Sequence, residues 1–337
     1  MPQALAWTAT SLAAQQFHTV AVSANGQVIA AGSLPGTLSV SRDGGATWSV
    51  GTGLPAGERW ISVDMSADGM HIVGVGFDGG LYVSHDSGAT FTRGDATISA
   101  VTGNAVQAYE SVTISDDGLR IVTAIQNGAV YMSTNGGASF TVSAGAPVAP
   151  WRALDSSANG MTVVGSHHNG DVYISTNGGA TFTLLPVTVG GVAVNDGWYR
   201  LALSRDGTTL AMAGNRQWGA GGPTTGIYVG RLAGGAWTFN QGSTVSGNYG
   251  AITMSATGAI IAASLYAPTA GGSAAQILVS SNNGVSFAPV TAPTATPANW
   301  RAIGLNAAGT TMVVGNGDFG AAASGLLYTS TGSVTGQ

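Results

Sequence analysis

Six ionisable side chains have the types and positions that could perform chemistry: Asp64, Asp155, Glu110, Arg152, Arg200 and Arg301. Two carboxylates that face each other can serve as an acid and a base, and polar residues that converge can line a pocket. They come from a small supply, because only 7% of the residues are charged, against about 25% in an ordinary globular protein. All ten basic residues are Arg. The net charge of −5 argues against electrostatic capture of nucleic acid or of an anionic membrane.

The chain of 337 residues has no Cys, which excludes disulfides, thiolate nucleophiles and Cys-ligated metals. We expect no membrane span, because no run approaches the roughly 18 apolar residues that a spanning helix needs. The first residues lack the charged and apolar regions of an intact secretory signal, so the given sequence shows no signal peptide. Its composition favours short strands over helices, since Gly, Ser, Thr and Val are abundant and Glu and Lys are scarce.

One block recurs seven times: an aromatic residue, alternating apolar residues, a turn that ends in Gly, and a second apolar run. Neighbouring copies lie 42 to 51 residues apart, whether they are measured between the aromatics or between the turn glycines. The leading aromatics are Phe17, Trp60, Tyr109, Trp151, Trp198, Tyr249 and Trp300. A period of about 40 to 50 residues with strand-like runs is typical of a propeller blade.

Each block predicts an inner β-hairpin, and a second hairpin follows it. The last copy lacks its final strand, and the segment LAWTAT around Trp7 can supply it from the other end of the chain. We therefore predict one all-β domain over residues 1–337: a seven-bladed β-propeller of four-stranded antiparallel blades. Its ring is closed by the N-terminal strand, which removes the open sheet edge.

The outer hairpins carry a second motif. SRDGGATW from Ser41 and SHDSGATF from Ser84 resemble the Asp-box of sialidase-like (BNR) propellers, and three further copies place Asn where the Asp belongs. In such a box the Asx side chain accepts hydrogen bonds from the turn and Gly supplies a positive φ, so its role is structural. The resemblance implies a catalytic set with an Arg-Ile-Pro motif and a Tyr-Glu pair, and this sequence lacks it.

The residues just after the leading aromatics differ from one repeat to the next. Because they occupy equivalent places, we expect them around a central mouth, as a pocket rim or as caps and ion pairs between strand ends. These candidate binding residues are His18, Glu110, Arg152, Tyr199, Arg200 and Arg301.

Asp64 and Asp155 occupy strand interiors where the other repeats have small residues. A carboxylate there would be buried and would need a partner, and Arg200 is a candidate mate for Asp155. The alternative is that the two carboxylates act as the acid and base of a glycoside hydrolase or lyase.

The last three repeats carry long insertions, each with one aromatic residue: Trp218, Tyr266 and Phe319. Aromatics presented together on one face suit stacking against sugars or against the apolar surface of a partner, although they can equally fold back as lids. The adjacent His167 and His168 read as part of a hairpin turn, so no metal site and no cofactor are expected.

Together these features favour a non-catalytic binding protein that recognises a glycan or a protein partner, outside the cell or at its surface. One alternative is the enzyme described above. Another is a structural subunit of a surface layer, filament or assembly complex, for which self-association is expected. The sequence leaves open whether the chain is an excised part of a larger protein.

Overall fold

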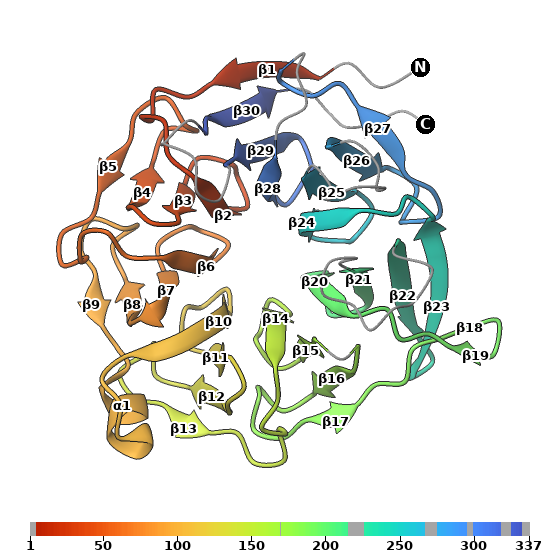
Figure 1. The fold of residues 1–337 in the computed structure, drawn as a ribbon, viewed down its shortest axis with the longest axis horizontal. Coiled ribbons are helices and arrows are strands. Elements are labelled where there is room, and N and C mark those ends of the chain that lie inside the picture. The colour runs from red at the N-terminus through yellow and green to blue at the C-terminus, as the bar shows by residue number, and fades with distance from the viewer. Residues whose placement is uncertain are drawn as a thin grey trace.

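The computed structural model of the protein describes residues 5–168, 170–214, 226–266, 275–294, 299–317 and 325–331. Its strands are grouped into sheets that stand radially around a central axis, as the blades of a β-propeller do (Figure 1). The one helix among the described residues, α1 (Ala96–Thr102), lies at the outer rim before the third repeat. No helix in the described part of the chain is long and apolar enough to cross a membrane.

Four repeats form separate four-stranded antiparallel sheets, numbered outward from the axis. The first repeat gives β2 (Phe17–Val22), β3 (Ile29–Ser33), β4 (Leu38–Ser41) and β5 (Ser49–Val50). The fourth gives β14 (Trp151–Ser156), β15 (Val163–His167), β16 (Val172–Ser175) and β17 (Thr183–Leu184). The fifth gives β20 (Trp198–Leu203), β21 (Thr209–Gly214), β22 (Ile227–Ala233) and β23 (Ala236–Ser243). The sixth gives β24 (Asn248–Met254), β25 (Ile261–Tyr266), β26 (Gln276–Ser280) and β27 (Ala288–Val290).

A fifth four-stranded sheet joins the two ends of the chain. It contains β28 (Trp300–Leu305), β29 (Thr311–Asn316), β30 (Leu327–Thr331) and, outermost, β1 (Ala6–Ala9). β1 pairs antiparallel with β30, and the indole Nε1 of Trp7 donates to the carbonyl oxygen of Thr291, 2.7 Å away. The prediction that the N-terminal strand completes the last sheet is confirmed by this pairing.

The prediction of seven blades is wrong, because the described residues form five separate four-stranded blades. The second and third repeats share one eight-stranded sheet instead. Its strands are β6 (Trp60–Met65), β7 (Ile72–Gly79), β8 (Leu81–Ser84), β9 (Thr92–Arg93), β10 (Gln107–Ile114), β11 (Ile121–Ile125), β12 (Val130–Ser133) and β13 (Thr141–Val142).

Strand length is the physical reason for this fusion. β10 begins before its leading aromatic, Tyr109, and β7 extends to Gly79. The two extensions meet, so that Gln107 pairs with Gly79 and Ala108 pairs with Phe77. A further hairpin, β18 (Thr188–Val189) with β19 (Val192–Ala193), lies between the fourth and fifth repeats and protrudes from the rim (Figure 1).

The leading aromatics form the apolar core between neighbouring sheets, and each is at most 1% exposed. The backbone makes room for them: a Cβ on Gly165 would lie 2.6 Å from the Trp151 ring. The glycine of every inner turn adopts a left-handed φ between 65° and 76°, a conformation that costs residues with a Cβ. These are Gly26, Gly69, Gly118, Gly160, Gly207, Gly258 and Gly309. Buried aromatics and left-handed turns together fix where each inner strand begins and ends.

Candidate functional site

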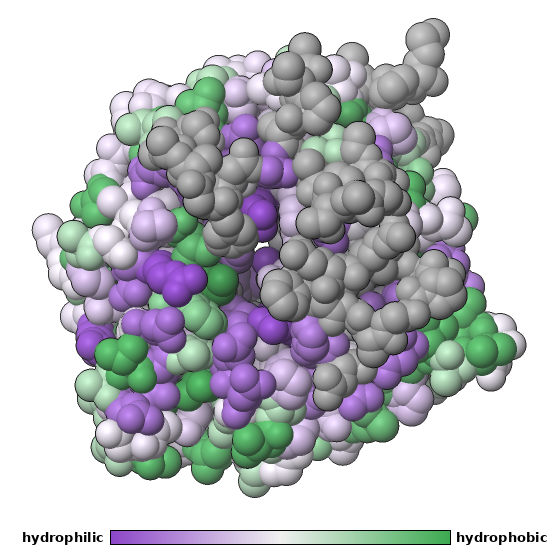
Figure 2. Space-filling view, viewed as in Figure 1, coloured by the Kyte–Doolittle hydropathy of each residue, from purple (hydrophilic) through white to green (hydrophobic). Residues whose placement is uncertain are grey.

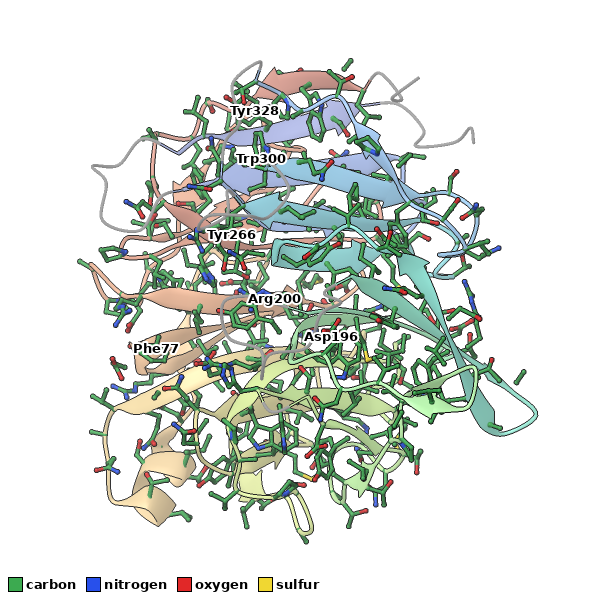
Figure 3. All side chains as sticks on the ribbon, turned by 45° about the vertical axis from the view of Figure 1, so that its right-hand side comes forward. Phe77, Asp196, Arg200, Tyr266, Trp300 and Tyr328 are labelled. Atoms are coloured by element: carbon green, nitrogen blue, oxygen red, sulfur yellow. The ribbon has the colours of Figure 1, made fainter. Side chains whose placement is uncertain are left out.

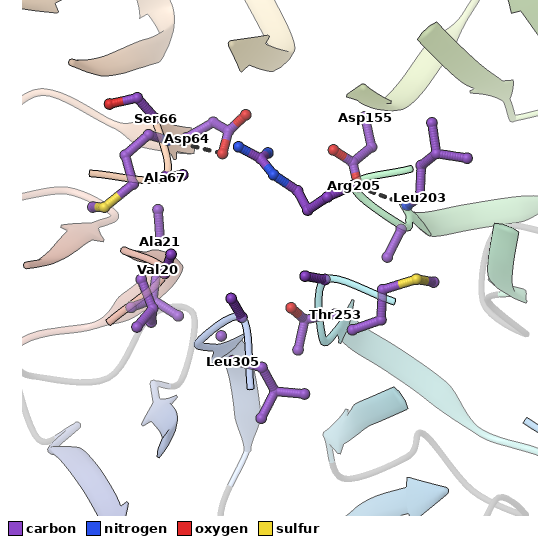
Figure 4. A pocket seen from close by; sticks show the side chains of 18 of the residues that line it. Val20, Ala21, Asp64, Ser66, Ala67, Asp155, Leu203, Arg205, Thr253 and Leu305 are labelled. Carbon is purple, nitrogen blue, oxygen red and sulfur yellow. Dashed lines mark hydrogen bonds between the residues drawn. The ribbon is translucent and has the colours of Figure 1, made fainter. Parts of the chain in front are cut away.

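The inner strands surround an axial channel that contains two cavities. One cavity, of about 190 Å³, lies at the strand starts and is called here the mouth cavity; its lining includes His18, Glu110, Arg152 and Arg200. The other, of about 260 Å³, lies at the inner turns and is called the turn-side cavity (Figure 4). Both are lined by Asp64 and Asp155, along with several apolar residues, so they are successive parts of one channel. Hydrophilic residues gather around the central opening (Figure 2).

Glu110 is one of the carboxylates that line the mouth cavity, and its side chain is 6% exposed. Its Oε1 accepts hydrogen bonds from Arg152, at 2.8 Å, and from the Gln126 amide, at 2.7 Å. Burial raises the pKa of Glu110, while the positive charges of Arg152 and Arg200 oppose that shift. Among the described residues, the buried Nε of Arg152 has no hydrogen-bond partner. Glu110 thus neutralises the charge of Arg152, and the Nε of Arg152 can still donate a hydrogen bond.

Arg200 also lines the mouth cavity, and its positive charge acts on Glu110. Figure 3 labels its side chain. Its Nε donates to the carbonyl oxygen of Gly250, 2.5 Å away. Its guanidinium carbon lies 4.3 Å from the ring centroid of Tyr199, and that of Arg152 lies 5.7 Å from the same ring. Such cation–π contacts hold a guanidinium in place without neutralising it.

Arg301 is next to this group. A Cβ on Gly250, the residue whose carbonyl binds Arg200, would lie 2.8 Å from the Cα of Arg301. The Nε of Arg301 donates to the carbonyl oxygen of Gly317, at 3.1 Å, and its guanidinium lies 4.1 Å from the ring centroid of Tyr266. The charges of Arg200 and Arg301 both act on His18, so Arg301 lies near the mouth, although it is not among the residues that line the cavity.

His18 is buried in the mouth wall, and its Nδ1 lies 3.2 Å from the carbonyl oxygen of Ile61. Burial, reinforced by the charges of Arg200 and Arg301, lowers the pKa of His18 to about 3. This histidine is therefore neutral at physiological pH and adds no positive charge to the mouth.

Asp64 and Asp155 link neighbouring inner strands in the part of the channel that the two cavities share. Asp64 Oδ2 accepts from the Ile114 amide, at 2.8 Å, and Asp155 Oδ2 accepts from the Leu203 amide, at 2.7 Å. Arg200 does not pair with Asp155, so the predicted ion pair is wrong: the carboxylate of Asp155 binds backbone amides, and Arg200 binds Gly250. Burial and the nearby charge of Asp64 raise the pKa of Asp155 to about 7, and burial also raises that of Asp64.

Two residues of the turn-side cavity were missed by the sequence reasoning. Arg205 reaches into the channel between Asp64 and Asp155 (Figure 4) and forms an ion pair with Asp116. Arg205 and Asp116 follow the inner-turn serines, where the other five repeats have Ala. Backbone hydrogen bonds of 2.7–3.2 Å run between these equivalent positions, as from the Ala158 amide to the Arg205 carbonyl. Comparison of the repeats could have identified Arg205 and Asp116, because they stand where the other repeats have Ala.

Of the three loop aromatics, Tyr266 lies among the described residues. Trp218 and Phe319 lie outside the part of the chain that the structure describes. Tyr266 is 7% exposed and packs under Arg301, so it supports that guanidinium and presents no open ring face. His167 is buried against Trp151 and Tyr173, and the described residues contain no group of three metal-ligating side chains.

The outer-hairpin turns that resemble Asp-boxes have the hydrogen bonds that a structural role requires. Asp43 accepts from the Thr47 amide, at 2.8 Å, and from its hydroxyl, at 2.5 Å, and these bonds lower the pKa of Asp43 to about 2. Asn135 accepts from the Ser139 amide, at 3.0 Å, and donates to its hydroxyl, at 2.9 Å. Asn replaces Asp here because the turn needs one acceptor oxygen.

Comparison with known proteins agrees with the propeller fold. The chain is similar to the solved structure of YCF48 bound to D1 peptide, with 17% identity and a TM-score of 0.67 over 98% of this chain and 99% of that one. It is also similar to the WD40 repeats of RRP9, with 8% identity and a TM-score of 0.69 over 98% and 99%. A third is U3-55K, with 9% identity and a TM-score of 0.67 over 98% and 100%. No family model and no curated protein matches the chain. At these identities the likeness defines the fold, a β-propeller.

Proposed function

We propose that this protein is a non-catalytic binding propeller whose mouth cavity receives an acidic segment of a protein partner. The observation that carries the proposal is a group of guanidiniums at the mouth: Arg152 and Arg200 line the cavity, and the charge of Arg301 acts on His18 in its wall. Glu110 pairs with Arg152, and the other two carboxylates of the lining, those of Asp64 and Asp155, accept hydrogen bonds from backbone amides. Guanidinium groups held in place by ring and backbone contacts are suited to binding carboxylates. The solved relative YCF48 was bound to a peptide, which supports a peptide as the class of ligand.

A protein partner is favoured over a glycan by the lining of the mouth. Recognition of neutral sugars depends on open aromatic faces, and Tyr266 is covered by Arg301. Catalysis by Asp64 and Asp155 has less support, because each carboxylate accepts backbone hydrogen bonds that join neighbouring strands.

The test measures binding of a fluorescent peptide rich in Asp and Glu and of the same peptide with Asn and Gln in their places. We expect the acidic peptide to bind and the amide version to bind much more weakly, and added salt to weaken the binding because exposed charges are screened. Arg200→Gln should reduce the affinity about tenfold or more, since losing a charge-assisted hydrogen bond costs roughly 1.5–3 kcal/mol.

Arg42→Gln is the matched control, because Arg42 is exposed on an outer turn, where it donates to Ser49. It should leave peptide binding unchanged. Equal binding of the two peptides, or equal affinity of the wild type and Arg200→Gln, would contradict the proposal. Thermal unfolding of each variant separates lost binding from lost folding.

A further inference from the structure

A pair of histidines lies at the turn end of the second repeat, away from the mouth. His71 directly precedes β7 and His85 directly follows β8. Ile72 pairs with Ser84 in the register of these strands, so the two histidines are the next residues to face each other. Their Nδ1 atoms form a hydrogen bond of 2.8 Å, in which one imidazole donates and the other accepts, and the rings meet edge to face with centroids 5.1 Å apart.

This pair is peculiar to the second repeat. The position of His71 carries Val28, Arg120, Thr162, Thr209, Ile260 or Thr311 in the other repeats. The position of His85 carries Arg42, Thr134, Thr176, Arg231 or Ser281 in the repeats that follow the same pattern. The scaffold therefore needs no histidine at either place, and two of the five histidines of the chain meet here.

We propose that His71 and His85 form a binding site for one divalent transition-metal ion of the Cu²⁺ or Ni²⁺ class. Metal–nitrogen bonds of about 2.0 Å that meet at about 90°, as in a tetragonal site, hold two nitrogens about 2.8 Å apart. That value equals the observed separation of the Nδ1 atoms. A tetrahedral Zn²⁺ site needs about 3.3 Å between the two nitrogens, so it fits less well.

The surroundings of the two rings suit this role. The His71 ring lies where a side chain on Gly118 would stand, and a Cβ there would come within 2.2 Å of it, so Gly118 leaves room for the ring. Asp68 lies close enough for its charge to interact with His71. His85 is exposed and His71 is half-buried, so water can complete the coordination. The Ser87 amide also donates to the Met70 carbonyl, at 2.9 Å, which fixes the spacing between the two chain segments.

The experiment titrates the untagged full chain with CuCl₂, NiCl₂ and ZnCl₂ by isothermal calorimetry in a non-chelating buffer. We expect one site per chain, with Cu²⁺ tighter than Ni²⁺ and Zn²⁺. The electron paramagnetic resonance spectrum of the Cu²⁺ complex should show coupling to two imidazole nitrogens. Bound metal should also raise the unfolding temperature, because it binds the folded chain preferentially.

His71→Thr and His85→Thr should each weaken Cu²⁺ binding about tenfold or more, and Thr is a residue that other repeats carry at these positions. His168→Thr is the matched control and should bind as the wild type does. The proposal is overturned if the wild type shows no saturable binding, if the two variants bind like the wild type, or if His168→Thr abolishes binding.

Discussion

At the scale of single residues, the scarce charges of this protein divide into two groups. Asp64 and Asp155 bind backbone amides of the next inner strand, so they hold sheets together. The guanidinium groups of Arg200 and Arg301 lie against the rings of Tyr199 and Tyr266. Comparison of the seven repeats within the chain identified both groups, because these residues differ from those at the equivalent positions of the other repeats. It assigned Arg200 to the wrong partner because an acceptor on the backbone leaves no trace in the sequence.

Because the pKa of Asp155 is raised in the folded protein, we expect the free energy of unfolding to depend on pH. Its pKa is about 7 in the folded protein, above the ordinary value of 3.8, because burial and Asp64 disfavour the ionised form. The folded state therefore binds this proton more tightly than the unfolded state does. The stabilisation is fully present below pH 4 and is lost as the pH rises to about 7. One pKa unit corresponds to about 1.4 kcal/mol, so the loss amounts to at most about 4 kcal/mol.

Urea unfolding of the wild type and of Asp155→Asn between pH 4 and pH 8 checks this expectation. The Asn side chain of the variant cannot ionise, so the free energy of unfolding of the variant should fall less than that of the wild type as the pH rises from 4 to 8. Asp43→Asn is the control, because the pKa of Asp43 is about 2 and lies below the range. Parallel profiles for the wild type and Asp155→Asn would show that Asp155 titrates normally.

At the scale of strands and turns, most of the structure follows from local sequence. Buried aromatics start the inner strands, and glycines with left-handed φ end the inner turns, as their spacing predicts. The eight-stranded sheet does not follow from the repeat, because it depends on two strands, β7 and β10, extending past their usual ends. Such pairing between neighbouring repeats is set by tertiary contacts, which override local preference.

Two glycines allow the cost of a left-handed backbone conformation to be measured separately from the cost of close packing. Gly69 and Gly57 both have a left-handed φ, of 74° and 72°. A Cβ on Gly69 would lie 2.6 Å from Val28 Cβ, whereas one on Gly57 would meet nothing within 4 Å. Gly57→Ala should cost about 1–2 kcal/mol for its conformation alone. Gly69→Ala should cost at least about 1 kcal/mol more, because the turn must also shift. Equal losses of unfolding free energy in chemical denaturation would show that packing between repeats adds nothing.

At the scale of the whole molecule, the ring depends on contacts between segments far apart in the sequence. β1 completes the sheet of β28, β29 and β30, and Leu5 joins the core that contains Trp300 and Tyr328. Closure was predictable because the last repeat lacks a strand and the start of the chain offers one. The ligand of the mouth could not be predicted in this way. The repeats encode the scaffold, whereas the mouth is built from positions where the repeats differ.

The closing strand gives a test of the ring. Deleting residues 1–9 removes β1 together with Leu5 and Trp7, and it exposes the edge of β30. The loss of apolar burial and of strand hydrogen bonds should cost on the order of 3–5 kcal/mol. The exposed edge should also promote association between molecules, since unpaired strand edges recruit other strands. Deleting residues 1–4 leaves β1 intact and is the control.

A synthetic peptide of residues 1–10, added to the shortened chain, should restore part of the lost thermal stability by pairing with β30, as peptides do when they add a strand to an exposed sheet edge. Thermal unfolding with and without the peptide measures this rescue, and analytical ultracentrifugation measures the association. If both deletions unfold at the same temperature, β1 contributes little to closure, and the remaining three strands of the last sheet suffice to hold the ring. If the longer deletion is destabilised but the peptide gives no rescue, the N-terminal segment acts through its covalent link, which lowers the entropy cost of pairing.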